Sequence, residues 1–251
     1  ALAAAVVQGI TEFLPVSSSG HLVMARLLLG IDDVPLLFDI LLHLSTLVAV
    51  ALVFRQRILS IVVAIVRFFR RRPTAEDKVN LKLLRLVLLA TVFTGVVGVG
   101  LSYLDAELHP KLVSSLFIVT GLVLIGTKFL HGSKQYDQIG AREALITGIA
   151  QGIGVLPGIS RSGITISAAL LAGIDREKAG ELSFLIAIPA IFGAAILDIQ
   201  QAGDLMNVVT PVSLAVGICA AFFSGLISLL LLIRLIRGGK LFLFSVYLVP
   251  L

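Results

Sequence analysis

The sequence predicts an all-α polytopic membrane protein, because its composition and its long apolar runs both depart from those of soluble domains. Of its 251 residues, 58% are hydrophobic and 14% are charged, whereas soluble domains are about 45–50% apolar and about 25% charged. The mean hydropathy is +1.07. Runs such as Val212–Ile233 hold the roughly 20 apolar residues that a membrane-spanning helix needs. A transmembrane β-barrel would instead show alternating segments of about ten residues, so the spans are predicted to be helices.

Six full-length spans are expected along the chain. They are predicted over 36–54, 84–104, 112–130, 182–198 and 212–233, with a sixth beginning near Leu241. The stretch 58–69 is too short to cross a bilayer, so we expect it to form a helix along the membrane surface.

Charged residues alternate between loops in a way that indicates topology. Arg and Lys gather within 67–85, 128–142 and 234–240, whereas the loops at 32–33, 105–107 and 198–204 carry acidic residues. Positive loops stay in the cytoplasm, and this rule assigns alternate loops to opposite faces without contradiction. The net charge of +5 therefore reflects topology, and we expect no nucleic-acid partner.

Two apolar regions are broken and do not fit the count of full spans. Residues 1–31 are interrupted by Pro15 and a Ser-Ser-Ser-Gly run, and residues 144–173 by a Pro-Gly pair and a further glycine. Basic residues flank the second region on both sides, so it should enter and leave the membrane from one face. Non-helical backbone is tolerated at membrane depth only inside protein or beside a water-filled cavity. Each region is therefore predicted to be a re-entrant helical hairpin.

The two broken regions are copies of one another. Shifting the chain by 143 residues gives 12 identities over the 25 positions 8–32, including Gln8-Gly9-Ile10 on Gln151-Gly152-Ile153. Shared apolar composition would not place polar residues and glycines in register, so we infer an internal duplication.

The charges that follow each copy predict that the copies are inverted relative to each other. Acidic residues follow the first hairpin and basic residues follow the second. The chain is thus expected to be one integral membrane domain with inverted repeat halves of about 1–131 and 141–251. Inverted repeats with broken helices place a binding site near the membrane midplane, so the polar residues of both breaks should form one site.

The first break carries groups suited to phosphate chemistry. Gln8 and Glu12 are four apart and share one helix face. Ser17, Ser18, Ser19 and Gly20 should open the next short helix, whose N-terminal N–H groups suit an anion, and His21 follows in its first turn. Ser17, Ser18 or His21 could be the nucleophile, and Glu12 could act as a base or hold a metal. The alternative is that Glu12 and His21 only pair to hold the hairpin.

The second break supplies a cation and further hydroxyls. It contains Ser160, Arg161, Ser162 and Gly163. An arginine at membrane depth needs a counter-charge, which Glu12 or a bound phosphate could provide. A Glu12–Arg161 salt bridge without a ligand is the structural alternative. Together the two breaks have the parts for phosphoryl transfer. The chain lacks GxxxxGK[ST] and HExxH motifs, so neither a P-loop nor a zinc-protease site is expected.

Asp39 and His43 form another pair four residues apart, at the start of the span 36–54. Such a pair could relay protons, bind a metal or simply order the end of a helix.

Two of these motifs resemble those of a known family. The run from Gln8 to His21 looks like the glutamate-rich first motif of the undecaprenyl-diphosphate phosphatases, the bacitracin-resistance family. The run from Pro157 to Gly163 resembles their second motif, Pro-Gly-x-Ser-Arg-Ser-Gly. The resemblance extends over nearly the whole chain.

The resemblance implies an integral membrane enzyme that removes one phosphate from undecaprenyl diphosphate and so recycles the lipid carrier for cell-wall synthesis. It implies a location in the inner or plasma membrane of a prokaryote, an active site open to the outer face, and dependence on a divalent cation, Mg²⁺ or alternatively Ca²⁺. The family's functional positions fall on Glu12, Ser17, Ser18, His21, Ser160 and Arg161. Gln8 stands where many members have Glu, so Glu12 is the metal ligand expected here, with Gln8 as a second.

Two other function classes are compatible with parts of this pattern. Inverted repeats around a midplane anion site are typical of secondary transporters, so a polyprenyl-lipid flippase or transporter is the main alternative. A purely structural membrane protein would leave buried Glu, His and Arg at two related breaks unexplained. The partners expected are the lipid substrate, membrane lipids and, as a further option, a second copy of the chain in a homodimer.

Overall fold

The computed structural model describes residues 2–29, 36–104, 109–199 and 210–251, and only the backbone of residues 25–29, 36 and 198–199. Within these ranges all regular structure is helical, apart from one parallel bridge between Lys134 and Ile174. The predicted all-α class is therefore confirmed. The acidic loops expected at 32–33 and 105–107, most of that at 198–204, and positions 30–32 of the repeat lie outside the described residues.

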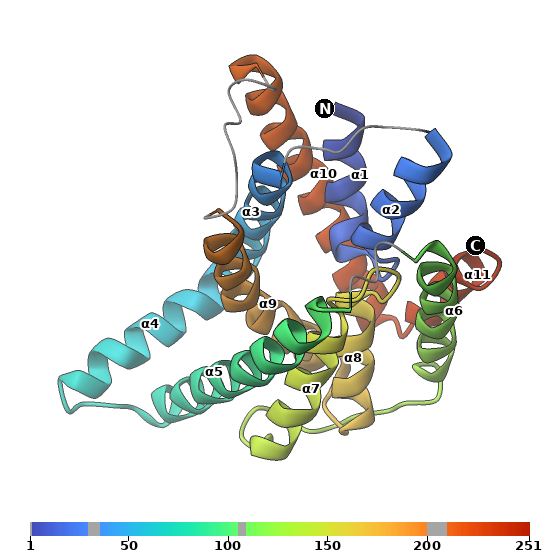
Figure 1. Ribbon diagram of the computed structural model, residues 1–251. Helices are drawn as coiled ribbons and strands as arrows, with labels where there is room; N and C mark the ends of the chain where they lie inside the picture. The colour runs from blue at the N-terminus through green and yellow to red at the C-terminus, as the bar shows by residue number, and fades with distance from the viewer. Residues whose placement is uncertain (1, 30–35, 105–108, 200–209) are drawn as a thin grey trace.

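Two short hairpins, α1–α2 and α7–α8, pack against longer helices (Figure 1). In chain order the helices are α1 (Leu2–Phe13), α2 (Ser18–Leu29), α3 (Leu36–Val53), α4 (Arg55–Phe69), α5 (Ala75–Ser102), α6 (Pro110–Gly126), α7 (Ala141–Ile153), α8 (Arg161–Leu171), α9 (Arg176–Ile199), α10 (Pro211–Arg237), η3 (Leu241–Phe244) and α11 (Ser245–Leu248). The hairpins α1–α2 and α7–α8 correspond to the two broken regions.

Several helices are long and apolar enough to cross a membrane, as expected for a multi-pass protein. Among the described residues three pass by length and composition, namely α5, α9 up to Leu197, and α10. The pair α3 and α4 would add a fourth, but its two helices are bent by 76°. The count of six spans, the re-entrant hairpins and the inverted repeat stay predictions.

The bend at Phe54 turns α4 away from the bundle. Figure 1 shows α4 projecting from the other helices beside the first turns of α5. The helix predicted over 58–69 therefore begins earlier, at Arg55. At the far end of α4, Thr74 starts α5 with a capping box, in which Thr74 Oγ1 accepts from the Asp77 N–H at 3.2 Å and the Asp77 carboxylate accepts from the Thr74 N–H at 2.8 Å.

The base of the α7–α8 hairpin is held by the loop that precedes it. Lys134 Nζ donates to Glu143 Oε1 at 2.8 Å and to the Ala172 carbonyl at 2.9 Å. One cation thus joins the start of α7 to the end of α8, where the helix dipole favours positive charge. Burial raises the pKa of Glu143, but hydrogen bonds from Lys134 and the Gly140 N–H outweigh it, so this pKa lies below its ordinary value.

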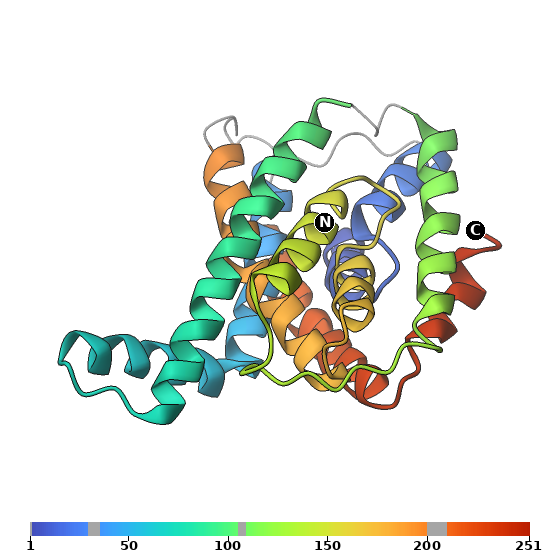
Figure 2. The ribbon, with the colours of Figure 1, turned by 90° about the horizontal axis from the view of Figure 1, so that it is seen from below.

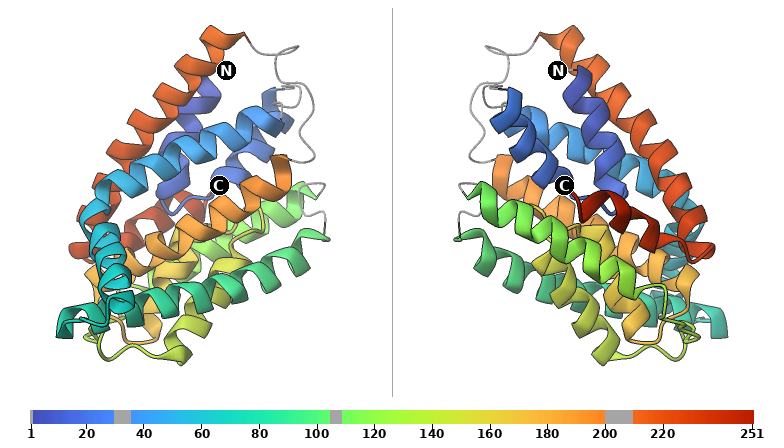
Figure 3. Two further views of the ribbon diagram at one scale, coloured as in Figure 1. Left: turned by 90° about the vertical axis from the view of Figure 1, so that its left-hand side faces the viewer. Right: turned by 90° about the vertical axis from the view of Figure 1, so that its right-hand side faces the viewer.

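Each hairpin packs against a long helix from the other half of the chain. α1 lies along α10, which both views of Figure 3 show, and α7 lies along α5. Figure 2 shows α7 and α8 between α5 and α6. Glycines permit this close packing. A Cβ at Gly9 would lie 2.6 Å from the Ala221 carbonyl oxygen, and one at Gly152 would lie 2.6 Å from Val97 Cβ.

The predicted sixth span is not a single continuous helix in the described chain. From Leu241 onward the chain forms the short helices η3 and α11, which pack against α6. This arrangement brings the residues of α11 next to the first hairpin.

The packing of α7 on α5 predicts that Gly148→Ala destabilises the protein. The added Cβ would lie 2.4 Å from the Ala90 carbonyl oxygen, and overpacking of this kind costs about 1–3 kcal/mol. Gly95→Ala on α5 is the matched control, because nothing lies within 4 Å of its Cβ position and alanine favours a helix. Thermal unfolding in detergent should give a lower midpoint for Gly148→Ala alone. Equal midpoints for both variants would contradict the packing.

Candidate functional site

The two breaks of the sequence lie against each other. α1 ends at Phe13 and α2 begins at Ser18, while α7 ends at Ile153 and α8 begins at Arg161. The Gly158 N–H donates to Ser17 Oγ at 3.0 Å, and Ser162 Oγ donates to the Phe13 carbonyl at 2.8 Å. Each break thus satisfies polar backbone groups of the other, as backbone away from water requires.

Small residues and positive φ angles shape both turns. Ser17 has φ 66° and Gly158 has φ 96°, a region that disfavours most side chains. A Cβ at Gly20 would lie 2.7 Å from the Gly158 nitrogen. Only glycine at position 20 therefore lets the start of α2 approach the second break this closely.

Glu12 is the centre of the site. Its side chain is 3% exposed, and Arg161 Nη2 pairs with its Oε1. Its Oε2 accepts from Ser18 Oγ at 3.0 Å and from Gln8 Nε2 at 2.9 Å, and it lies 3.9 Å from His43 Nδ1. Glu12 or a bound phosphate was expected as the counter-charge of Arg161, and in the structure Glu12 forms the ion pair.

The hydroxyls and glycines of the two breaks have different roles. Ser17 Oγ is an acceptor for the Gly158 N–H and also, at 3.4 Å, for the Gly20 N–H. Ser160 Oγ accepts from the Gly163 N–H at 3.1 Å and so caps α8. Ser160 Oγ also lies 3.3 Å from Ser162 Oγ. The Ser19 side chain is half-buried in the first turn of α2.

His21 does not pair with Glu12 but with an aromatic residue near the end of the chain. Its Nδ1 lies 2.8 Å from the Ser17 carbonyl oxygen, so this nitrogen carries the proton and donates. Its Nε2 is then an acceptor for the Tyr247 hydroxyl at 2.7 Å. The Tyr247 ring stacks on the imidazole with centroids 5.7 Å apart. Sequence reasoning missed Tyr247, because a tyrosine in an apolar run more often serves packing.

His43 reaches the site from α3. Its Nδ1 lies 2.5 Å from Gln8 Nε2, and its side chain is 34% exposed. Among the described residues it makes no hydrogen bond to Asp39, so the expected pair on α3 is not formed.

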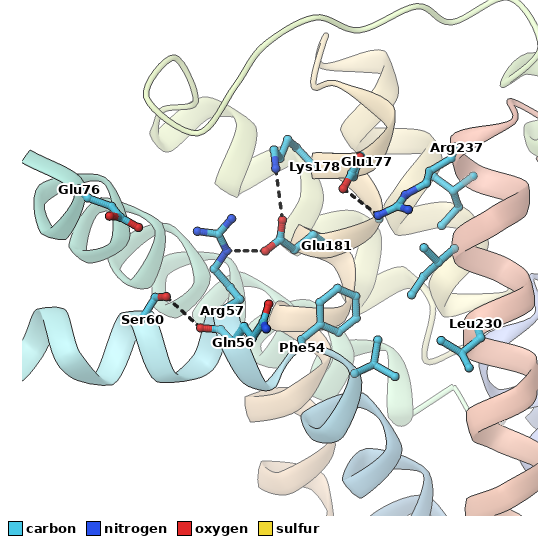
Figure 4. A pocket seen from close by; sticks show the side chains of 14 residues that line it. Phe54, Gln56, Arg57, Ser60, Glu76, Glu177, Lys178, Glu181, Leu230 and Arg237 are labelled. Carbon is cyan, nitrogen blue, oxygen red and sulfur yellow. Dashed lines mark hydrogen bonds and ion pairs between the residues drawn. The ribbon is translucent and has the colours of Figure 1, made fainter.

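The site is narrow, and a larger cavity lies elsewhere in the described chain. The space bounded by Glu12, Arg161 and Phe184 measures about 10 Å³, which is about enough for one water molecule. A cavity of about 570 Å³ opens between the α3–α4 bend, α9 and α10 (Figure 4). It contains none of the predicted site residues. Its charges form ion pairs, Arg57–Glu181 at 2.5 Å and Arg237–Glu177 at 2.9 Å.

A divalent cation would find few negatively charged ligands at the site. Across the described ranges no three His, Cys, Asp or Glu side chains form a cluster that could hold a metal. Glu12 supplies one carboxylate, and Gln8 Oε1 is buried without a hydrogen-bond partner there. An unsatisfied amide oxygen beside a carboxylate fits an oxygen-seeking cation.

Comparison with known proteins settles the family. The family described as bacitracin resistance protein BacA matches residues 1–251. The chain belongs to this family. A relative from Treponema denticola is 49% identical over 245 residues, covering 98% of this chain and 91% of its own length. Relatives from Borrelia recurrentis (97% and 92% covered) and Carboxydothermus hydrogenoformans (98% and 92%) are 40% and 39% identical. All three are named undecaprenyl-diphosphatase. The bacitracin-resistance resemblance of the two motifs is thus confirmed.

Tyr247 provides a test of the contact between α11 and the first hairpin of this family member. Tyr247→Phe removes the hydrogen bond to His21 Nε2, so we expect the free energy of unfolding to fall by about 1 kcal/mol. Tyr103→Phe is the control, because Tyr103 is 80% exposed. Thermal unfolding gives the energies, and nitrogen NMR of labelled histidine should show a shifted His21 Nε2 signal. An unchanged His21 signal would refute the contact.

Proposed function

We infer that the chain is an undecaprenyl-diphosphatase, which hydrolyses undecaprenyl diphosphate to undecaprenyl phosphate and inorganic phosphate and so recycles the carrier lipid of cell-wall synthesis. The full-length family match and the names of the relatives support this activity. The observation in the structure that supports it most is the Glu12–Arg161 pair with serines at two helix starts. The flippase or transporter alternative receives no support from the relatives, which are named for hydrolysis.

The proposed architecture is a pair of inverted halves, about 1–131 and 141–251, in a prokaryotic cell membrane. Three observations support it: the gapless repeat, the matching positions of Gly9 and Gly152 in close helix contacts, and the packing of each hairpin on the opposite half. The charge pattern of the loops favours a site that opens toward the outer face. The lipid tail would lie between helices.

Arg161 is proposed to hold the phosphates of the substrate. Its guanidinium has five N–H donors and matches phosphate oxygens in a fork. The first backbone N–H groups of a helix lack partners within that helix. The backbone N–H groups of Ser19 and Ser162 can therefore add donors at the starts of α2 and α8. The N–H groups of Gly20 and Gly163 are engaged by Ser17 and Ser160. We therefore propose that Gly20, Gly163 and Ser160 shape the turns around the phosphate.

Ser18 is the nucleophile that the geometry favours. Its Oγ donates to Glu12 Oε2, so Glu12 can take the proton as Oγ attacks the distal phosphorus. The bridging P–O bond breaks, undecaprenyl phosphate leaves, and water then hydrolyses the phosphoserine. Ser17 Oγ receives two N–H groups and His21 Nε2 receives the Tyr247 hydroxyl, so both have positioning roles here.

Glu12, with Gln8, would hold the divalent cation, for which Mg²⁺ and Ca²⁺ are the proposed ions. When bound, such a cation supplies positive charge that stabilises the phosphate oxygens.

The site assignment predicts that Glu12→Gln and Arg161→Ala each lower phosphate release by about a thousandfold. Glu177→Gln and Arg237→Ala are matched controls from the large cavity and should keep the activity of the unmodified chain. Purified protein in detergent with undecaprenyl diphosphate gives the rates, and gel filtration shows that each variant is folded. This assay has no second compartment, so release of phosphate means hydrolysis. Near-normal turnover in both site variants would contradict the assignment of Glu12 and Arg161 to the active site.

The nucleophile can be tested with two serine variants. Ser18→Ala should lower turnover at least about a hundredfold, because the attacking oxygen is removed, while gel filtration and thermal unfolding stay near those of the unmodified chain. Ser115→Ala on α6 is the control, since among the described residues its hydroxyl donates only to the Lys111 carbonyl of the same helix. Substantial turnover by Ser18→Ala would point to attack by water or by His21 instead.

A further inference from the structure

We propose that His43 Nδ1 is a ligand of the divalent cation at Glu12, so that this chain uses one nitrogen and two oxygens where two carboxylates would otherwise serve. The inference rests on the proposed function, which places a cation at Glu12. It assigns a role to a histidine on α3, outside both breaks and both motifs.

The lone pair of His43 Nδ1 faces the site. Nδ1 lies 2.5 Å from Gln8 Nε2, and an amide nitrogen can only donate. Nδ1 is therefore the acceptor, and the proton of the neutral ring is on the other nitrogen. A metal-binding imidazole must present such a lone pair. The partly exposed side chain of His43 also leaves the ring reachable from outside.

Gln8 supplies the second independent observation. Its Oε1 is buried and has no hydrogen-bond partner among the described residues, which costs free energy. Rotation of the amide would exchange Oε1 with Nε2, which now bridges Glu12 Oε2 at 2.9 Å and His43 Nδ1. With the proton of His43 on its other nitrogen, three acceptor atoms would then face one another, an arrangement that a cation between them would stabilise.

The separations of these atoms suit one shared ion. Gln8 Nε2 lies 2.5 and 2.9 Å from the two acceptors, which are themselves 3.9 Å apart. Ligands with bonds of about 2.1 Å to one ion lie roughly 3–4 Å from each other. Arg161 occupies Oε1 of Glu12, so the carboxylate can bind the ion through Oε2 and keep its ion pair.

Two properties follow from this ligand set. Glu12 and Arg161 already neutralise each other, so a bound dication leaves excess positive charge that an added diphosphate would balance. Pyrophosphate and the cation should therefore strengthen each other's binding to the same extent. An imidazole ligand also favours transition-metal ions over Mg²⁺ and Ca²⁺, which prefer oxygen. We expect this chain to bind Mn²⁺ in preference to Mg²⁺.

Pulsed EPR of the full chain in detergent with Mn²⁺ and pyrophosphate tests the ligand directly, because it detects a nitrogen bound to the ion. The spectrum should show a nitrogen coupling that His43→Gln removes while Mn²⁺ binding weakens at least about tenfold. His131→Gln is the matched control, since His131 is exposed and its one hydrogen bond within the described chain is to the Phe129 carbonyl. His43→Glu gives a ligand set of oxygens alone, so it should bind without the nitrogen coupling and shift preference toward Mg²⁺.

Three results would overturn the proposal: no Mn²⁺ binding, bound Mn²⁺ without a nitrogen coupling, or a coupling that survives in His43→Gln and disappears in His21→Gln. Phosphate release from undecaprenyl diphosphate, measured on the same preparations, judges the proposed function separately. A chain that binds Mn²⁺ through His43 but releases no phosphate would contradict the proposed activity, but not the assignment of His43 as a metal ligand. A chain that releases phosphate but shows no nitrogen coupling would contradict only the assignment of His43 as a metal ligand.

Discussion

The ion pair between Glu12 and Arg161 is the interaction on which the rest of the structure depends. An arginine or a glutamate alone at membrane depth is costly, and removal of one partner from a buried pair typically costs about 3–5 kcal/mol. The two residues lie 149 positions apart, at the end of α1 and the start of α8. Because the pair can form only when both hairpins are in place, it links the position of each break to that of the other.

The broken helices are possible because each break satisfies the polar backbone of the other or is satisfied by α6. Ser17 accepts from Gly158, and Ser162 donates to Phe13. Thr120 on α6 donates to the Gly158 carbonyl at 2.9 Å and accepts from the Ser160 N–H at 3.2 Å. Irregular backbone at membrane depth is tolerated only when such partners exist. The helix starts that carry the serines are therefore held in place by hydrogen bonds from the other break and from α6.

The sequence allowed the helical class, both breaks and the polar residues of each to be predicted, since glycines and polar groups recur in register within apolar runs, where they are costly unless buried against a partner. It identified His43 as a residue that could bind a metal but did not place it beside Gln8 and Glu12, and it did not identify Tyr247. Both lie outside the breaks, and the face that each turns toward the site depends on how α3 and α11 pack on their neighbours. The bend of 76° at Phe54 lies where the predicted span 36–54 ends and the surface helix was expected to follow. Arg57 just beyond it pairs with Glu181 of α9.

The contrast between the two cavities explains why the narrow one is suited to an anion. In the large cavity Glu181 and Glu177 have their own basic partners, Arg57 and Arg237. In the site one buried carboxylate receives Arg161, Ser18 and Gln8 together. Because the guanidinium has five donors and Glu12 uses few of them, Arg161 can bind a phosphate without releasing Glu12. A lysine could not do this in the same planar geometry. Binding of an anion to Arg161 therefore need not leave a buried carboxylate unpaired, which is the condition that any ligand of this site must meet.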